Sequence, residues 1–417
     1  MIKTNKYFDY KYKKKANKLI IFLFIALFFI AINIFSGSVS NFSYADDDST
    51  DSITEQLTDS VNEQLDALNL TELEALVDEL TSTQSSIFGE GSFLSKLSKI
   101  LLQEYDADMG SVFQQVMGLI FDELLAFLPL LATICAIAIL SSFIGNLRGK
   151  SNESSIGDII HFVCYGVIIV LICAYVANLI ALTTDTLNLL KLQMDAIFPI
   201  LLTLLTSVGG IVSVSVYQPA VAILTNGITQ VFTYVVFPLF LFSFIFSIVG
   251  NLSSTIKLNK FISFFNSSFK WITGTIMTLF FTYLTFQGIT AGSYDGISAK
   301  TAKYAIKSYV PIVGSYLSDG FNLIISSSIL IKNAIGVTGL ILLVATIVLP
   351  VIKIIVFSLG LKLVSAIIEP VVDPRISNFI YSVAKSLNFL IAIILCIAFM
   401  YVVCIGLIIC TGNMFYT

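Results

Sequence analysis

Long apolar runs fill the chain from Leu124 to Cys410, and they restrict its fold more than any other feature. A run of about 20 apolar residues in a helix is long enough to cross the roughly 30 Å hydrocarbon core of a bilayer. The mean hydropathy of +0.91 and a charged fraction of only 12% also place the chain among membrane proteins. We therefore expect an all-α, polytopic integral membrane helical bundle.

The apolar runs divide into about eight predicted spans within a membrane domain of residues 124–417. The fourth span is long and contains Asn226, Gln230 and Pro238, so it must tilt, kink or break. Trp271 opens the fifth span, where an interfacial aromatic residue belongs. The predicted spans are 124–145, 159–182, 196–216, 220–249, 271–290, 309–331, 334–357 and 386–411.

Residues 1–45 have the layout of a secretory signal. Seven lysines precede the apolar run Leu19 to Phe35, and the small residues Ser43 and Ala45 stand three and one positions before a predicted cut. Because the apolar run is slightly long for a signal peptide, an uncleaved signal anchor is the alternative. In both cases Asp46 starts outside the membrane.

Residues 46–123 form an acidic extracytoplasmic region, and sixteen of the chain's 27 acidic residues lie between Asp46 and Asp108. Thr71 followed by Glu74 predicts a helix start, and Leu73 and Leu76 begin an apolar stripe behind it. This pattern predicts amphipathic helices. They either lie on the membrane or form a docking surface for an extracytoplasmic partner.

The stretch from Ser293 to Gly339 combines polar residues and helix breakers with a predicted span. An ionised Asp319 near the bilayer centre would cost about 2.5 to 3.5 kcal/mol, so its side chain should face protein or water. The polar groups form a ridge that either lines an aqueous path or joins helices by hydrogen bonds. The predicted pathway or helix-packing residues are Pro311, Gly314, Asp319, Asn322, Lys332 and Asn333, with Pro199 from an earlier span.

Two lysine clusters conflict over orientation. Eight spans that start outside at Leu124 put Arg148 and Lys150 inside, as the positive-inside rule requires. The cluster at residues 257–270 then lies outside, whereas an interfacial basic face of Lys300, Lys303 and Lys307 lies inside. No arrangement of these spans satisfies both clusters, so one cluster is an exception or one span is re-entrant.

An internal repeat with an offset of 112 residues would explain this conflict. The offset brings Pro199 onto Pro311 and Pro238 onto Pro350, although the chain has only eight prolines. It aligns the three spans of 159–249 with the three spans of 271–357, and an odd number of spans inverts the second copy in the membrane. The alternative is a chance match between apolar segments. A real inverted repeat predicts that the segments starting at Pro199 and Pro311 meet near the midplane.

Motifs for enzymatic chemistry are absent from the sequence. It contains no P-loop, no HExxH and no GxSxG, and its single histidine is His161. Its six cysteines all lie in apolar spans, which favours reduced packing residues. No basic run outside the N-terminus suits nucleic acid. We expect neither enzymatic activity, nor a cofactor or metal, nor a nucleic-acid partner.

The central stretch resembles the signature of the stage III sporulation protein AE family, and the likeness extends from about residue 95 to 411. The resemblance implies a permease- or channel-like membrane subunit of the mother-cell-to-forespore transport or secretion complex. It further implies the mother-cell membrane around the forespore as its location. The residues that carry the resemblance are Asp295-Gly296, Lys303, Pro311 to Gly314, Ser318-Asp319, Leu330, Lys332-Asn333, Gly336 and Gly339.

The family also implies partners: the lipid bilayer, the other membrane proteins of the stage III A operon, a cytoplasmic ATPase (protein AA), and ring proteins that meet forespore protein Q. Two other functions stay open at this point. An autonomous ion-coupled secondary transporter would use Asp319 to bind H⁺ or Na⁺. A structural scaffold would instead anchor the complex and use the polar ridge to hold helices together.

Overall fold

A computed structural model of the chain describes residues 59–78 with gaps, 97, 109–147, 154–252, 258–309 and 314–413. Every element in these residues is a helix, which confirms the predicted all-α class. Side chains are described for fewer residues, chiefly 114–144, 162–250, 258–286 and 322–411. The predicted signal segment, Pro311 and the links at 148–153 and 310–313 lie outside the described residues.

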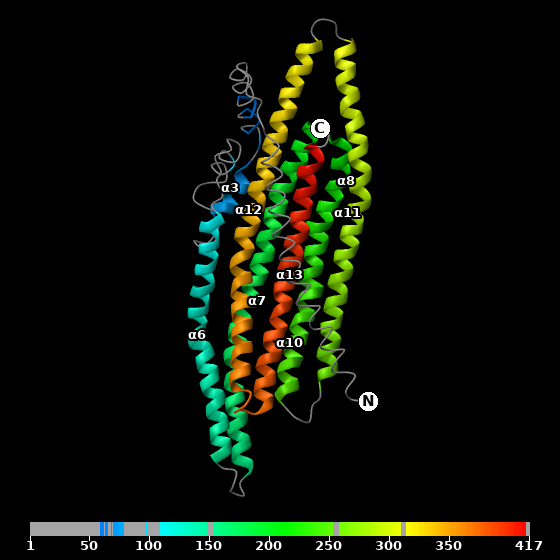
Figure 1. Ribbon diagram of the computed structural model, residues 1–417. Coiled ribbons are helices and arrows are strands. Elements are labelled where there is room, and N and C mark those ends of the chain that lie inside the picture. Colours follow the sequence, from blue (N-terminus) through cyan, green and yellow to red (C-terminus); the bar gives the residue numbers. More distant parts are fainter. Residues whose placement is uncertain are drawn as a thin grey trace.

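Long helices run side by side along one axis and form an elongated bundle (Figure 1). Residues Ile211 to Leu252 form one distorted helix, in which α-helical and π-helical parts alternate. The described elements are α3 (Thr71–Asp78), α6 (Met109–Leu147), α7 (Ser154–Ser207), α8 (Ile211–Ala222), η1 (Ile223–Ile228), α9 (Thr229–Val231), η2 (Phe232–Val236), α10 (Phe237–Leu252), α11 (Asn259–Tyr309), α12 (Gly314–Ile368) and α13 (Pro374–Asn413).

Consecutive long helices alternate in direction because short links join them. We call the end of the bundle where α7 meets α8 and α11 meets α12 the upper end, and α13 also ends on that side (Figure 1). The end of α6 and the start of α7 lie at the lower end, as do the end of α10 with the start of α11 and the end of α12 with the start of α13 (Figure 1). Thus α7, α11 and α13 run upward, whereas α6, α8 to α10 and α12 run downward.

Helix α12 is the central element, since it packs against α6, α7, α11 and α13. Three of its glycines allow close approach by neighbouring side chains. A Cβ added at Gly336 would lie 2.5 Å from Ile409 Cδ1 of α13, and one at Gly360 would lie 2.5 Å from Leu131 Cδ1 of α6. At Gly339 it would lie 2.9 Å from Ile197 Cδ1 of α7. Small residues therefore set the spacing of the bundle, as is common between membrane helices.

The predicted span count is wrong for the helices around α7. The spans 159–182 and 196–216 were separated by the polar residues Asp185, Lys191 and Asp195, yet α7 continues through all three. No glycine or proline lies between Ala181 and Phe198, so nothing there interrupts the backbone hydrogen bonds. Asp185 and Asp195 lie on the exposed side of a continuous helix.

The same correction applies to α12, which contains most of the predicted spans 309–331 and 334–357 in one helix. The polar pair Lys332 and Asn333 is buried inside the bundle instead of forming a link. Within the described residues, five helical stretches are long and apolar enough to cross a membrane, where we predicted about eight. They are Gln114–Ile144, Phe162–Ser207, Ile211–Gly250, Asn322–Ile368 and Pro374–Thr411.

The predicted fourth span is distorted, as its composition required. Its helix contains two π-helical parts, η1 and η2, and Pro238 follows η2 by two residues. Proline has no N–H to donate to the carbonyl four residues earlier, and π-helical turns are a common way to accommodate such a break. Thr229 Oγ1 donates to the carbonyl of Leu224, five residues earlier, at 2.9 Å.

The inverted repeat is not present as drawn. Each predicted three-span unit is a pair of long helices, namely α7 with α8 to α10, and α11 with α12. Because each unit contains two helices, an even number, the first helix of both units runs upward and the second runs downward (Figure 1). Pro199 lies near the upper end of α7 and is exposed, and Gly314 begins α12 at the upper end. The segments that start at Pro199 and Pro311 therefore do not meet at mid-depth.

Candidate functional site

The polar segment of α12, residues Asn322 to Asn333, lies in the upper part of the bundle. The first two turns of α12, from Gly314, precede this segment and contain Asp319, whose backbone is helical. Ser327, Ser328 and Lys332 are buried, and Asn333 is nearly so. The predicted ridge is therefore largely enclosed by other parts of the chain, and its partners decide between the two interpretations of it.

The N-terminal acidic region supplies the partners of the two serines. Gln64 Nε2 donates to Ser327 Oγ at 2.6 Å, and Ser328 Oγ donates to Gln64 Oε1 at 2.8 Å. Gln64 Nε2 also lies 3.3 Å from the carbonyl oxygen of Ile324, and Ser60 Oγ lies 3.1 Å from Ser327 Oγ. We call this set, Ser60 and Gln64 with Ser327 and Ser328, the clasp.

Apolar side chains hold the clasp region against the bundle. Leu73 of α3 and Leu97 are fully buried, and Leu70 and Leu76 are nearly so. Helix α3 begins at Thr71, as the capping pattern predicts, and packs against α7. Its acidic residues Glu72 and Glu74 are not in the buried set. The described part of the acidic region thus docks on the protein's own helices.

Lys332 is fully buried and contacts the C-terminal end of α13. Its Nζ donates to the carbonyl oxygen of Ile409 at 3.0 Å and to that of Ile408 at 3.3 Å. A helix C-terminus carries partial negative charge and has unsatisfied carbonyls, so it is a favourable neighbour for an ammonium group. Among the described side chains, no carboxylate forms an ion pair with Lys332. This lysine joins α12 to α13.

The amide oxygens of Asn322 and Asn333 are both buried. Asn322 is half-buried, and its Oδ1 is buried without a hydrogen-bond partner among the described residues. It lies one turn after Asp319 on the same face of α12. The side chains of Gly314, Asp319, Lys300, Lys303 and Lys307 lie outside the described residues, although their backbones are helical in α11 and α12. The basic face is therefore placed at the upper part of α11.

A second polar contact, which the sequence did not reveal, lies deeper in the bundle. Gln193 Nε2 of α7 donates to Thr346 Oγ1 of α12 at 2.7 Å, and both residues are fully buried. The signal was a glutamine between Lys191 and Asp195, and Gln193 fell in a stretch that we interpreted as a link between two spans. The backbone carbonyls that bind Lys332 leave no sequence signal at all.

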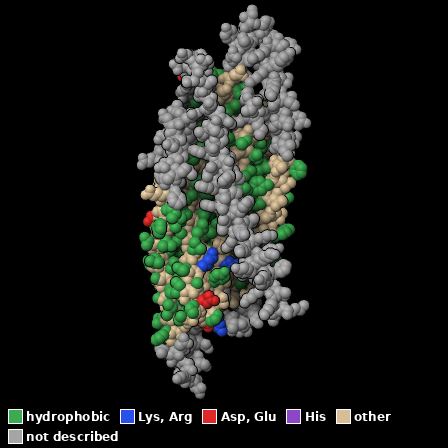
Figure 2. All heavy atoms as spheres, in the orientation of Figure 1, with side chains coloured by type: hydrophobic (Ala, Val, Ile, Leu, Met, Phe, Trp, Pro, Cys, Tyr) green, Lys and Arg blue, Asp and Glu red, His purple; other side chains and the backbone are tan. Residues whose placement is uncertain are grey.

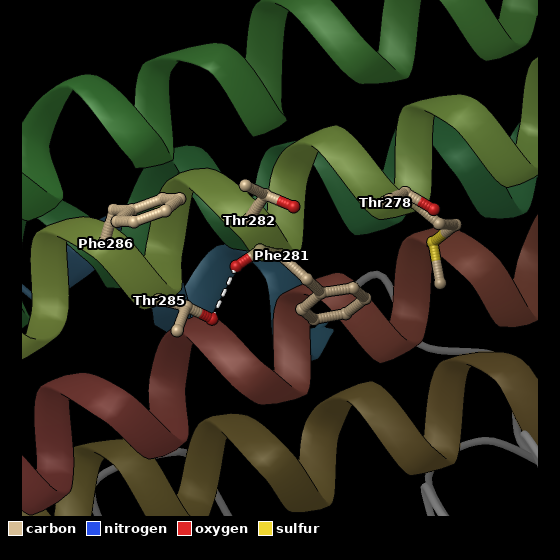
Figure 3. Close-up of a pocket in the computed structure, with 6 residues that line it drawn as sticks. Thr278, Phe281, Thr282, Thr285 and Phe286 are labelled. Atoms are coloured by element: carbon tan, nitrogen blue, oxygen red, sulfur yellow. Dashed lines mark hydrogen bonds between the residues drawn. The ribbon is translucent and has the colours of Figure 1, made fainter.

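The outer face of α11 carries a groove of about 460 Å³, lined by residues from Met277 to Phe286 (Figure 3). Two of its three threonine hydroxyls are used within the helix, since Thr278 and Thr285 donate to carbonyls four residues earlier at 2.8 Å. Phe281 turns toward α13 and contacts Phe399, with ring centroids 5.3 Å apart. The groove therefore offers mainly apolar contact, and it presents no charged group.

Three comparisons with known proteins bear on this arrangement. The family model of stage III sporulation protein AE matches residues 92–412. The chain belongs to the stage III sporulation protein AE family. It is 26% identical to stage III sporulation protein AE of Bacillus subtilis (strain 168) over 295 aligned residues. The aligned residues make up 71% of this chain and 74% of that protein. No solved structure matches the chain.

The family match confirms the resemblance and implies a role in sporulation. It includes α6 to α13 almost completely, and therefore the polar segment of α12 and the C-terminal end of α13 that holds Lys332. It begins at residue 92, after Ser60 and Gln64. The clasp therefore joins a segment outside the matched region to the centre of this sporulation protein AE family member.

The clasp makes a prediction about chain proximity. A Ser60→Cys, Ser327→Cys variant, with the six native cysteines replaced, should form an intramolecular disulfide under mild oxidation, because the two hydroxyl oxygens lie 3.1 Å apart. Proteolysis between the two sites, followed by non-reducing electrophoresis, measures the crosslink. The matched control pairs Ser60→Cys with Ser326→Cys, since Ser326 is exposed and points to another side of α12. Equal crosslinking in both variants would contradict the clasp.

Proposed function

We propose that this chain is the multi-pass membrane subunit of the mother-cell-to-forespore transport or secretion complex required for endospore formation. Its place would be the mother-cell membrane around the forespore. Its partners would be the other membrane proteins of the stage III A operon, the cytoplasmic ATPase (protein AA), and the ring proteins that meet forespore protein Q. Family membership over residues 92–412 and the five apolar helices support this proposal.

Within that complex, a structural role as a membrane anchor has the better support from the geometry. The observation that carries it is that Ser327, Ser328 and Lys332 of α12 all hydrogen-bond inside the protein. Groups used in this way hold helices together and are not free to line a path. The chain would thus be a rigid bundle that holds its partners in the membrane, without enzymatic activity, cofactor or nucleic acid.

A permease- or channel-like role is the second candidate, and one observation favours it. The buried, unpartnered Oδ1 of Asn322 lies one turn from Asp319, so this part of α12 keeps polar capacity that the described residues do not satisfy. A polar group of this kind is suited to water or a passing solute. An autonomous ion-coupled transporter would require the Asp319 charge as well.

Asp319→Asn separates these roles, because the amide keeps the hydrogen-bonding shape and removes the charge. For an anchor, we expect spore yield within roughly twofold of the unchanged chain, since hydrogen bonds between helices are worth only about 0.6 kcal/mol on average. The measurement is heat-resistant spore counts after complementation of a deletion strain, with membrane abundance followed by immunoblot. A loss of spores at normal abundance would refute the anchor role and favour a charge-dependent path.

Membership of the complex needs its own measurement. A tagged chain purified from sporulating cells in mild detergent should retain the proposed operon partners, whichever role Asp319 has. Failure to retain any of them, with the chain intact and in the membrane fraction, would contradict the proposed assembly.

A further inference from the structure

The bundle is too long for its whole length to lie inside a bilayer. Helix α13 has 40 residues, which corresponds to about 60 Å of helix. The hydrocarbon core is only about 30 Å thick. About half of the bundle's length must therefore lie outside the hydrocarbon, and the exposed side chains can show which half.

Contacts between helices divide the bundle into two tiers. The ion pair between Lys353 of α12 and Glu123 of α6, at 3.3 Å, marks the boundary. We define the lower tier as the part below this pair: 124–147, 154–182, 237–252, 259–272, 354–368 and 374–390. The upper tier is the rest of the same helices, toward the upper end.

Ring contacts confirm that these ranges share a level. Phe269 of α11 contacts Phe389 of α13 in the lower tier, with ring centroids 4.3 Å apart. Phe281 and Phe399 make the corresponding contact in the upper tier. In the lower tier Ser358 Oγ also donates to the carbonyl of Ala384 at 2.8 Å.

The outside of the lower tier is a belt of large apolar side chains. On the side where α6 and α12 lie, hydrophobic side chains cover the lower part of the molecule (Figure 2). Surfaces of this size and kind on a single chain are covered by lipid or protein. Typical members are Leu125, Leu128, Val167, Phe242, Leu359 and Leu363, with 43% to 63% of each side chain exposed.

The outside of the upper tier is polar by comparison. Asp185 and Asp195 of α7 are exposed there, and so are Asn226 and Gln230 of the distorted helix. Each aspartate would cost about 2.5 to 3.5 kcal/mol at the centre of a bilayer. Exposed apolar residues also occur in the upper tier: Leu192 and Ile223 stand near these polar groups, whereas Leu279 and Phe286 lie on the apolar outer face of α11. The face formed by α7 and the distorted helix therefore suits water better than hydrocarbon.

Charged residues in the lower tier fit this division. Its described residues include one acidic residue, Asp158, which lies five residues into α7 at the lower end; Glu123 stands at the boundary and Glu369 at the lower end. Lys270, Lys362 and Lys385 are present, and lysine can extend its ammonium group toward the membrane surface.

Two exposed aromatic residues mark the upper edge of the belt. Trp271 of α11 is 72% exposed, and Tyr234 of η2 is 75% exposed. The hydrogen bond of Ser243 to Asn266 Oδ1, at 2.6 Å, sets the register of these neighbouring helices and brings the two aromatic residues to similar depth. Trp and Tyr are enriched where hydrocarbon meets the headgroups.

We infer that the bilayer's hydrocarbon surrounds the lower tier and at most about two helical turns above it, and that the rest of the upper tier, with the clasp, projects into the aqueous space on the side opposite the cytoplasm. Lys260 and Arg375 lie at the lower end, and in the sequence Arg148 and Lys150 directly follow α6, which ends there, so this end is cytoplasmic by the positive-inside rule. The inference depends on the surface of the chain and is independent of the proposed function.

The half-embedded bundle also explains the conflict between the lysine clusters. Lys260 stands at the start of α11, and Lys300 to Lys307 stand near its upper end, so the clusters lie at opposite ends of one helix. The second cluster begins about 60 Å along the helix from the first, well beyond the hydrocarbon. The positive-inside rule applies only within about 15 to 20 residues of the membrane, so this cluster is outside its range.

Single-cysteine variants of the otherwise cysteine-free full chain test the inference in proteoliposomes. Asp195→Cys and Asn226→Cys report on the upper tier, and Phe242→Cys and Leu359→Cys on the lower tier; all four positions are exposed in the isolated chain. We expect a membrane-impermeant maleimide to label the upper pair roughly tenfold faster than the lower pair, which hydrocarbon should cover. Labelling after denaturation in detergent controls for the amount of each variant.

A second readout separates lipid from other forms of cover. A fluorophore on each cysteine, attached before reconstitution, should be strongly quenched by lipids with spin-labelled acyl chains at Phe242 and Leu359, and weakly at Asp195 and Asn226. This pattern, together with the labelling difference, supports the half-embedded bundle. Equal quenching at all four positions, or stronger quenching in the upper pair, would overturn it.

Discussion

Replacing Lys332 by Glu should lower the stability of this protein more than any other single charge change in the described residues. The ammonium group now donates to the carbonyls of Ile408 and Ile409 at the negative end of α13. A carboxylate at the same buried position would face those carbonyls without a donor. An uncompensated buried charge costs about 3 to 5 kcal/mol. We expect a loss of unfolding free energy in this range.

The measurement is thermal unfolding of the detergent-solubilised protein, with membrane abundance in cells as a second readout. A loss of this size should lower the midpoint by roughly 10 °C. Lys332→Met is the conservative comparison, because it removes the charge and keeps the length, and its loss should be smaller. Lys260→Glu makes the same charge change at an exposed site and should have little effect. If Lys332→Glu and Lys260→Glu are equally stable, the contact with α13 has no energetic weight.

The second large effect is expected at Gly336, where side chains of α13 pack directly against the backbone of α12. A Cβ there would lie 2.5 Å from Cδ1 and 2.7 Å from Cγ1 of Ile409, which is 1% exposed and has little room to move. Gly336→Val should therefore separate the helices or force a strained rotamer, at a cost of about 1 to 3 kcal/mol. Thermal unfolding in detergent again measures the loss.

The matched control is Gly166→Val in α7, because a Cβ there meets nothing within 4 Å. Both variants carry the same β-branched side chain in a helix, so their difference isolates the clash. Adding Ile409→Ala should restore part of the loss of Gly336→Val, giving a favourable coupling of at least about 1 kcal/mol in a double-mutant cycle. Additive losses from the two substitutions would contradict a direct contact between these sites.

Several features of the protein could be predicted from the sequence because they depend on local composition. Apolar runs of sufficient length predict helices in a membrane, whichever neighbours they have. The start of α3 at Thr71 follows from a local capping pattern, and the distortion of the fourth span follows from Pro238 and the amides near it. The family could be recognised because its signature is a contiguous stretch of α11 and α12.

The number and direction of the long helices were predicted incorrectly for one reason. Hydropathy shows where polar residues interrupt an apolar run, but not whether the helix ends there. In α7 the residues Asp185 and Asp195 lie on the outside of a continuous helix, and in α12 Lys332 lies on the inside. When two predicted spans turn out to be one helix, the chain changes direction one time fewer. The predicted direction of every later helix is then reversed.

The sequence by itself determined that this protein is an all-helical membrane protein of the sporulation protein AE family, since composition and a contiguous signature are sufficient for both. Only the tertiary structure decided what the polar residues of α12 do. Ser327 binds a side chain about 260 positions earlier, and Lys332 binds backbone carbonyls about 76 positions later. Such partners depend on how the helices pack against one another, and no local pattern records that packing.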